Sequence, residues 1–469
     1  MIISPDHDIE QPLSSWTIAL IIVATFQFLG PFLVSSVNVA LPAIGNELSA
    51  SASQLGLVNN VMVLATVAFL LPVGRLSDIY GRKRIFFAGA AMIAIVTLAL
   101  GITDTMWTFL VLRFFQGLAN AMIMVSGFAI LITIVPVQRR GRAIGIVVAM
   151  IYTGMSAGPS LSGFIISQLG WRWIFFLVFG IVLLALLMAL IWLKGEWVVS
   201  KGEPFDYKGA GLFAVSLCLI TYGVTQMAKE ESAFLLMLLG IIGLGFFIFI
   251  EWNSSYPLLD LHLMINNLNF TFNNIYTFFN YASTTSFIFF FSLYLQYVKE
   301  LSPQNAGLFL IIQPIAQAVF SLLAGRLADR YQPSGIATAG MAICTIALFS
   351  AALIDKGSSF PFIVVVSLLL GIGLGFFSTP NMTAVMSSVS AQYHGLAASM
   401  VSTMRNLGML FCTTIITVVL FCFLGNQPVM SNNTNHFVRS MHFSFLLFGI
   451  LSLAGTLLSI LINRKIQKR

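Results

Sequence analysis

Long apolar segments constrain this chain more than any other feature of its sequence. About fourteen runs, most of them near or above the roughly 20 residues that a helix needs to cross a bilayer, follow one another with short connections. We place them at residues 16–42, 53–74, 84–102, 107–135, 142–167, 172–193, 208–227, 233–252, 269–297, 304–326, 335–354, 360–386, 395–424 and 441–463. Only 8% of the 469 residues are charged, where a soluble protein would carry about a quarter. The sequence therefore predicts an all-α polytopic membrane protein without a sizeable soluble domain.

Lysine and arginine are distributed unevenly between alternate connections, and this predicts the orientation in the membrane. If the N-terminus is cytoplasmic, sixteen of the 23 basic residues lie inside, five lie outside, and Arg113 and Arg405 remain within spans. Because basic residues accumulate on the cytoplasmic side, we expect both termini there, in the inner or plasma membrane. The same bias accounts for the net charge of +7, so no nucleic-acid partner is expected. The four cysteines lie in apolar runs, which favours packing residues over metal ligands.

A short motif occurs twice, about 250 residues apart, each time between two apolar runs. GRLSDIYGRKR begins at Gly74 and GRLADRYQ begins at Gly325. Such duplication is typical of transporters built from two related helical bundles. We therefore predict an N-terminal six-helix bundle (1–193), a linker with two extra transmembrane helices (194–268) and a C-terminal six-helix bundle (269–469).

The two motif copies also suggest a charged hinge in a short loop on the cytoplasmic side. A carboxylate there can accept hydrogen bonds from basic neighbours, and a contact made in only one conformation biases the conformational equilibrium. The residues that we assign to this hinge are Gly74, Asp78, Gly81, Arg82 and Arg84 of the first copy and Gly325 and Asp329 of the second. The alternative is that these residues are only topology signals. A fixed spacing of one acid and two glycines favours the hinge.

The fifth run carries a cluster of small residues, Gly154, Gly158 and Gly163, together with Pro159. Glycines four residues apart allow a neighbouring helix to approach closely, and a proline within a helix bends it. Ordinary helix packing is the alternative to a functional role.

The polar residues within the spans are two arginines and several amides. A membrane-embedded arginine normally faces a polar cavity and a partner, although its side chain can also extend to the interface. We expect a substrate or coupling cavity to involve Arg113, Gln116, Asn38, Asn120, Asn280, Gln313, Gln317, Asn381 and Arg405. All sixteen acidic residues fall in connections or at span ends. Without a central carboxylate to offset a cation, the cavity should suit a neutral or anionic amphiphile, and Arg113→Ala should impair anionic substrates most.

Together these motifs resemble the major facilitator superfamily, and within it the fourteen-helix drug/proton antiporters. RFFQG (113–117) resembles the fourth-helix motif, whose arginine is associated with proton coupling. GMSAGPSLSG (154–163) resembles the fifth-helix signature of exporters, which implies a bend that seals the interface between the halves. NVALP (38–42) resembles the end of the first helix, but Leu33 stands where these antiporters usually carry an aspartate.

No metalloprotease, nucleotide-binding or nucleophile-elbow motif is present, so we expect a transporter rather than an enzyme, with no cofactor and no metal. The resemblance implies a monomeric secondary exporter in the lipid bilayer, moving small molecules by alternating access. Exchange for protons stays open, because no acid lies at mid-membrane. The alternative is a facilitator, importer or lipid or metabolite transporter of the same fold without proton coupling.

Overall fold

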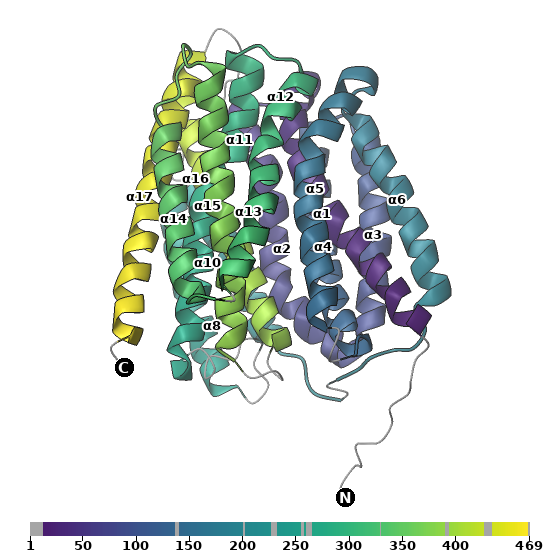
Figure 1. Cartoon of the computed structure of the whole chain (residues 1–469). Helices are drawn as coiled ribbons and strands as arrows, with labels where there is room; N and C mark the ends of the chain where they lie inside the picture. Colours follow the sequence, from purple (N-terminus) through teal and green to yellow (C-terminus); the bar gives the residue numbers. More distant parts are fainter. Residues whose placement is uncertain are drawn as a thin grey trace, which may run out of the picture.

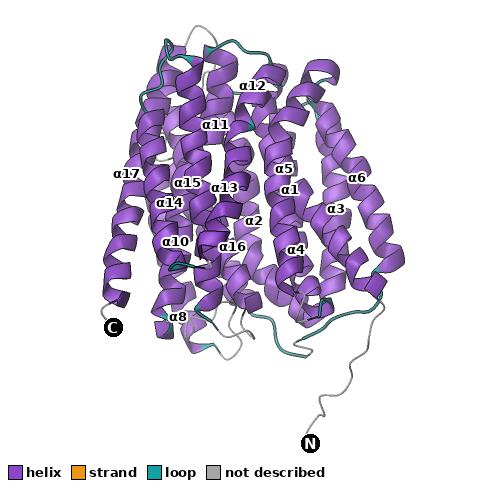
Figure 2. Ribbon diagram, in the orientation of Figure 1, coloured by secondary structure: helices purple, strands orange, loops and turns teal. Residues whose placement is uncertain are grey.

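The computed structural model describes residues 13–136, 140–199, 202–226, 232–254, 258, 265–328, 330–389, 394–425 and 434–467. Within these residues the chain is helical, and the rest is turns and connections (Figure 2). The N-terminal half consists of α1 (Leu13–Glu47), α2 (Ala52–Tyr80), α3 (Arg82–Ile102), α4 (Met106–Ile134), α5 (Arg140–Leu169) and α6 (Arg172–Trp192). A pair of helices follows, α7 (Tyr207–Gln226) and α8 (Ser232–Asn253), which we call the inserted pair.

The C-terminal half repeats the six-segment plan, with two segments interrupted. Its helices are α10 (Leu268–Thr284), α11 (Ser286–Leu293), the π-helix η2 (Tyr294–Val298), α12 (Pro303–Leu310), α13 (Ile312–Ala328), α14 (Pro333–Ala351), α15 (Phe360–Ser387), α16 (His394–Leu424) and α17 (Thr434–Gln467). The run predicted at 269–297 is α10, α11 and η2, and the run at 304–326 is α12 and α13. The fourteen predicted segments are therefore present, arranged as six, two and six.

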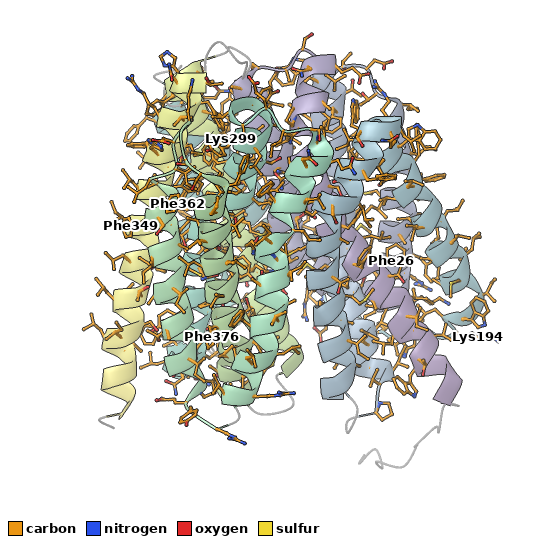
Figure 3. The ribbon with its side chains drawn as sticks, turned by 45° about the horizontal axis from the view of Figure 1, so that its top comes forward. Phe26, Lys194, Lys299, Phe349, Phe362 and Phe376 are labelled. Atoms are coloured by element: carbon orange, nitrogen blue, oxygen red, sulfur yellow. The ribbon has the colours of Figure 1, made fainter. Side chains whose placement is uncertain are left out.

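The outer surface of the bundle is apolar, as a lipid environment requires. Exposed side chains include Leu184 on α6, Phe249 on α8 and Leu322 on α13, and such side chains surround the bundle in Figure 3. Within the described residues, twelve segments are long and apolar enough to cross a membrane. The two others are α5 and the α10–η2 segment, and α10 alone carries four asparagines. The chain is a multi-pass membrane protein.

The helix ends define two faces of the bundle. Leu13 and Gln467, where α1 begins and α17 ends, lie at the same end, which we call the terminal face (Figure 1). The other end is the opposite face. In Figure 3, Lys194 lies after α6 at the terminal face, and Lys299 lies after η2 at the opposite face.

The two halves meet near the opposite face through uncharged groups. Ser292 Oγ donates a hydrogen bond to the carbonyl oxygen of Asn38 at 2.6 Å, and Gln296 Nε2 donates to the carbonyl oxygen of Val39 at 3.1 Å. Thr414 Oγ1 on α16 donates to Asn60 Oδ1 on α2 at 3.3 Å. We call this contact region the seam.

The connections are shorter than the sequence suggested. The first motif copy was expected in a loop, but α2 continues to Tyr80 and α3 begins at Arg82, so that Gly81 alone separates them. The terminal helices also exceed their predicted spans, because α1 runs from Leu13 to Glu47 and α17 from Thr434 to Gln467. The cause is that hydropathy marks only the lipid-embedded part of a helix, whereas backbone hydrogen bonding continues into the polar ends.

Candidate functional site

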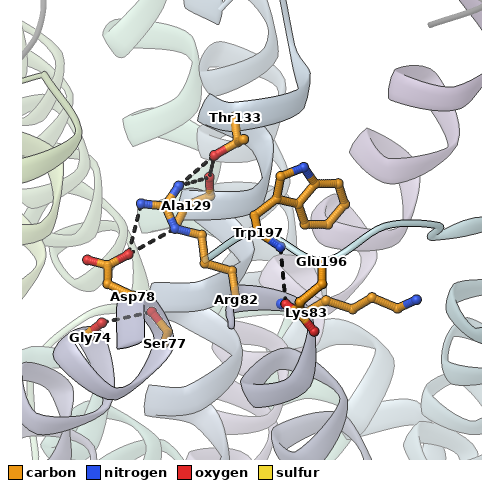
Figure 4. A network of polar contacts seen from close by, with 9 residues as sticks. All are labelled: Gly74, Ser77, Asp78, Arg82, Lys83, Ala129, Thr133, Glu196 and Trp197. Atoms are coloured by element: carbon orange, nitrogen blue, oxygen red, sulfur yellow. Dashed lines mark hydrogen bonds and ion pairs between the residues drawn. The ribbon is translucent and has the colours of Figure 1, made fainter. Parts of the chain in front are cut away.

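The predicted hinge is an ion pair that connects three helices at the terminal face. Nε and NH2 of Arg82 each lie 2.9 Å from Asp78 Oδ1. The NH1 group of the same arginine donates to the carbonyl oxygen of Ala129 at 3.1 Å and to Thr133 Oγ1 at 2.5 Å (Figure 4). Arg82 therefore joins the end of α2, the start of α3 and the end of α4. Asp78 thus accepts hydrogen bonds from a basic neighbour, as expected, whereas the role of this ion pair as a hinge stays a prediction.

The other basic residues of the motif have acidic partners elsewhere in the chain. They contact acids in the linker after α6, which the sequence analysis did not assign to the site. Glu196 Oε1 accepts a hydrogen bond from the backbone N–H of Lys83 at 2.9 Å, and its other oxygen lies 3.6 Å from Arg84 Nε. Arg75 forms an ion pair with Glu203. The signal that could have indicated them is the presence of two acids in a short connection that faces the basic motif.

The motif glycines differ in what they require. Gly81 has φ = 117°, and an added Cβ would lie 2.5 Å from Glu196 Oε1, so both backbone conformation and space demand glycine. An added Cβ at Gly74 would make only an ordinary 3.4 Å contact with Val125 on α4. The equivalent Gly325 would make the same 3.4 Å contact with Thr379 on α15, which shows that the two motif copies occupy matching places. Asp329 lies outside the described residues.

The glycines of α5 are points of close helix contact. An added Cβ would lie 2.3 Å from the carbonyl oxygen of Phe28 at Gly154 and 1.9 Å from Ser35 Oγ at Gly158, so both glycines abut α1. At Gly163 it would lie 2.5 Å from the carbonyl oxygen of Pro303, which starts α12 in the other half.

Gly307 of α12, in the C-terminal half, also packs against α5: an added Cβ there would lie 2.2 Å from the carbonyl oxygen of Pro159. One end of the α5 motif therefore packs within the N-terminal half, and the other end packs across the seam. Its role in antiport stays a prediction.

Arg113 is 0% exposed and lies inside the N-terminal half. Its Nε donates to the carbonyl oxygen of Val58 at 3.2 Å, its NH2 group donates to Asn59 Oδ1 at 3.0 Å, and its NH1 group donates to Gln116 Oε1. A buried guanidinium is expensive unless its donors are satisfied, and here two amides and a backbone carbonyl satisfy them.

This arginine is connected to the seam through a second amide pair. Asn59 Nδ2 donates to Asn38 Oδ1 at 2.8 Å, and the backbone carbonyl of Asn38 accepts the hydrogen bond from Ser292 of the other half. The predicted residues Arg113, Gln116 and Asn38 thus belong to one network, and Asn59 is the member that the sequence analysis missed.

The other predicted cavity residues are spread over both halves. Asn120 faces α1, where an added Cβ on Gly30 would lie 2.9 Å from its Oδ1. In the C-terminal half, Gln313 Nε2 donates to Gln317 Oε1 at 3.1 Å, and Asn381 Nδ2 donates to Thr277 Oγ1 at 2.8 Å.

Two further members of the predicted set stand apart. Asn280 is fully buried with its Nδ2 3.9 Å from the sulfur of Cys344. Arg405 is half-buried on α16, and no hydrogen bond or ion pair joins it to another described residue. The structure therefore does not bring all nine residues into one cluster, and their shared role as a cavity stays a prediction.

The chain is similar to known transporters along almost its whole length. The sequence pattern of the Major Facilitator Superfamily matches residues 23–272 and 274–468. The riboflavin transporter RibZ of Clostridioides difficile is 28% identical over 454 residues, which cover 96% of this chain and 98% of that protein. The multidrug resistance protein Stp of Mycobacterium tuberculosis is 27% identical over 404 residues, 83% of this chain and 73% of that protein. The tetracenomycin C resistance and export protein of Streptomyces glaucescens is 23% identical over 394 residues, 83% of this chain and 73% of that protein.

Solved structures agree on the fold. A bacterial homologue of the human lysosomal transporter Spinster, in an inward-facing and unoccupied conformation, superposes with a TM-score of 0.70 at 14% identity, covering 98% of this chain and 99% of that one. A proton-dependent oligopeptide transporter gives a TM-score of 0.67 at 13% identity, covering 97% of this chain and 100% of that one. The chain therefore belongs to the Major Facilitator Superfamily of transporters, and the resemblance of its motifs to the drug/proton antiporters of that superfamily is confirmed.

Proposed function

We propose that this transporter exports small amphiphilic compounds, neutral or anionic, across the cell membrane by alternating access. The observation that carries the proposal is the seam. Both halves meet near the opposite face through hydroxyl, amide and glycine contacts, such as Ser292 with Asn38 and Gly307 with Pro159. Uncharged contacts of this kind cost little to break, because water replaces each hydrogen bond when the halves part. A seam of this composition supports a gate that opens and closes.

The placement of the acids supports the proposed substrate class. In the described part of the chain, every carboxylate lies in a connection or within two residues of a helix end. Glu47 at the end of α1 is paired with Arg172 and accepts a 2.6 Å hydrogen bond from Trp171 Nε1. The interior offers amides, hydroxyls and a buried arginine instead. Glu251 is buried, but it lies two residues from the end of α8. Away from the helix ends, a dication would find no carboxylate among the described residues to offset its desolvation, whereas a neutral heteroaromatic compound would find hydrogen-bond partners.

A second candidate is transport of a riboflavin-like metabolite. It is favoured by the riboflavin transporter that matches nearly the full length of both chains, whereas the two drug-resistance relatives are matched over 73% of their length. Such a substrate is also uncharged and rich in hydrogen-bond groups, so the amide-lined interior suits it equally well. Direction of transport separates the two candidates.

Orientation is part of the proposal. The distribution of basic residues supports a cytoplasmic location for the terminal face, which carries the Asp78–Arg82 ion pair, the start of α1 and the end of α17. In this orientation the seam lies on the outer side of the bundle, which supports export of substrate taken up from the cytoplasm.

Proteoliposomes of known orientation test the function. Uptake of three matched fluorescent dyes (neutral, monoanionic and dicationic) and of riboflavin is measured with and without an imposed pH gradient. We expect transport of the neutral and anionic dyes from the cytoplasmic side. Acceleration by a pH gradient would establish proton exchange. Transport of the dication would contradict the substrate class, and riboflavin movement toward the cytoplasmic side alone would favour the second candidate.

A further inference from the structure

The linker between α6 and α7 is attached to the turn between α2 and α3. We call residues 194–199 together with Glu203 the strap. The backbone N–H of Arg82 donates to the carbonyl oxygen of Trp197 at 2.9 Å, and the N–H of Val199 donates to the carbonyl oxygen of Asp78 at 3.0 Å. Glu196 and Glu203 add the contacts with Lys83, Arg84 and Arg75 described above. The strap thus touches the motif through both backbone and side chains.

These bonds complete two helix ends that lack partners of their own. The first N–H groups of a helix and its last carbonyl groups have no partner within the helix. Gly81 precedes α3 and has no side chain with which to cap it, so the strap supplies acceptors for the N–H groups of Arg82 and Lys83. In the same way Val199 supplies a donor for a terminal carbonyl of α2.

Glu196 of the strap also offsets unfavourable charge at the start of α3. The first turn of α3 carries Arg82, Lys83 and Arg84, at the end of the helix where the macrodipole is positive and cations are unfavourable. Glu196 places a carboxylate at this end, as a capping acid would. Figure 4 shows its side chain beside the start of α3. Glu196 is therefore suited to be a positioning residue for the turn that holds the Asp78–Arg82 ion pair.

The strap leads directly into the inserted pair, which lies against both halves. The hydroxyl of Tyr207, the first residue of α7, is 3.4 Å from that of Tyr80, the last residue of α2. Within the membrane, Phe213 and Leu217 of α7 share an apolar cluster with helices from the two halves. That cluster also contains Val63 and Val67 of α2, Phe247 of α8 and Leu410 of α16.

The two kinds of contact differ in what they permit. The contact between α7 and α16 in this cluster is apolar and non-directional, so the helices can slide past each other without losing a specific partner. The strap and the tyrosine pair are directional and hold α7 to α2. We propose that the strap makes the inserted pair move as one body with the N-terminal half, with Glu196 and Glu203 as positioning residues, while its contact with α16 slides. This inference rests on the alternating-access part of the proposed function and is independent of substrate and direction.

Distances between spin labels test the inference without a substrate. Exposed positions near the terminal face suit the labels: Leu187→Cys on α6, Phe249→Cys on α8 and Tyr331→Cys after α13. Cys218 and Cys422 are replaced by alanine, and the buried Cys344 and Cys412 stay. We expect a single narrow distance between the labels on α6 and α8, and a broader or double distribution between those on α8 and at 331. The reverse pattern would overturn the inference.

The strap itself is tested by Glu196→Gln with Glu203→Gln, which keeps side-chain size and removes both charges. We expect the narrow α6–α8 distribution to be lost, while the control Glu300→Gln, an exposed acid at the opposite face, leaves it unchanged. An unchanged distribution in the double variant would overturn the role of the two acids. Narrow distributions for both label pairs in the wild type would contradict alternating access, and the double variant would still decide whether the strap holds the inserted pair.

Discussion

Gly307 in α12 allows a direct test of whether the seam opens and closes. An added Cβ would lie 2.2 Å from the carbonyl oxygen of Pro159 and 2.9 Å from its carbonyl carbon, although real Cβ atoms essentially never come within 3.0 Å of another heavy atom. The obstacle is backbone of the other half, so no side-chain rotation relieves it. The atoms can reach normal contact only if α12 and α5 separate by about 1 Å. Gly307→Ala should therefore raise the free energy of the closed seam selectively.

The size of the effect follows from the cost of overpacking. Extra methyl groups in a well-packed contact typically cost about 1–3 kcal/mol. Because the open conformation avoids the clash, the whole cost acts on the equilibrium between closed and open seam, which corresponds to a shift of about 5- to 150-fold. Ser292→Cys reports this shift, since position 292 is 0% exposed when the seam is closed. In a chain without the exposed Cys422, its labelling by a membrane-impermeant maleimide from the opposite face should accelerate at least about fivefold.

Two other glycines provide matched controls. At Gly154 the added Cβ would lie 2.3 Å from the carbonyl oxygen of Phe28, within the same half, so Gly154→Ala should lower thermal stability without changing the labelling rate. Gly180 has no atom within 4 Å of an added Cβ, so Gly180→Ala should change neither. Unchanged labelling in a folded Gly307→Ala variant would refute the assignment of this contact to an opening seam.

Three further predictions concern orientation, the hinge and the buried arginine. A cysteine that replaces Lys356 should react with a membrane-impermeant reagent added outside intact cells, and a cysteine that replaces Lys83 should not. The opposite result would show that the protein has the inverse orientation in the membrane. Asp78→Asn should leave membrane insertion intact while transport falls about fivefold, since a partly exposed charge-assisted bond to Arg82 is worth about 1 kcal/mol. Asp104→Asn is the control, and full activity of Asp78→Asn would mean that the motif is only a topology signal. Arg113→Ala should reduce transport of neutral and anionic dyes alike, because Arg113 is fully enclosed by protein. A loss of transport confined to anionic dyes would instead indicate that Arg113 contacts the substrate directly.

The sequence predicted most securely what depends on one short stretch of chain. The spans follow from the length of each apolar run, and the bond between Asp78 and Arg82 follows from their spacing of four residues. Close packing at Gly154 and Gly158 was likewise expected from small residues at a helical interval, although the partner helix was not. Each of these inferences needed no knowledge of what lies across from the segment.

What the sequence left out depends on contacts between distant segments. Glu196 lies 113 residues from Lys83, and an acid in a connecting segment has no periodic pattern that would assign it to a partner. The same holds for Asn59, whose position on α2 faces α1 and α4 only once the three helices pack. Helix ends were misplaced for another reason, because hydropathy follows lipid and not backbone hydrogen bonding.

Arg113 shows how a correct observation led to an incomplete interpretation. A charged residue within a span was expected to face a cavity, since the membrane gives it no other polar surroundings. The structure gives it protein surroundings instead: Asn59, Gln116 and a backbone carbonyl take up its donors with no exposed surface. Asn59 then holds Asn38, whose carbonyl binds Ser292 across the seam. A cation fixed in this way orders amides that touch the other half, so it can influence opening without meeting the substrate. Leu33, which stands where the antiporters that this chain resembles usually carry an aspartate, is 0% exposed in the apolar core. Because amides and a carbonyl already accept the hydrogen bonds of Arg113, this arginine needs no carboxylate from position 33.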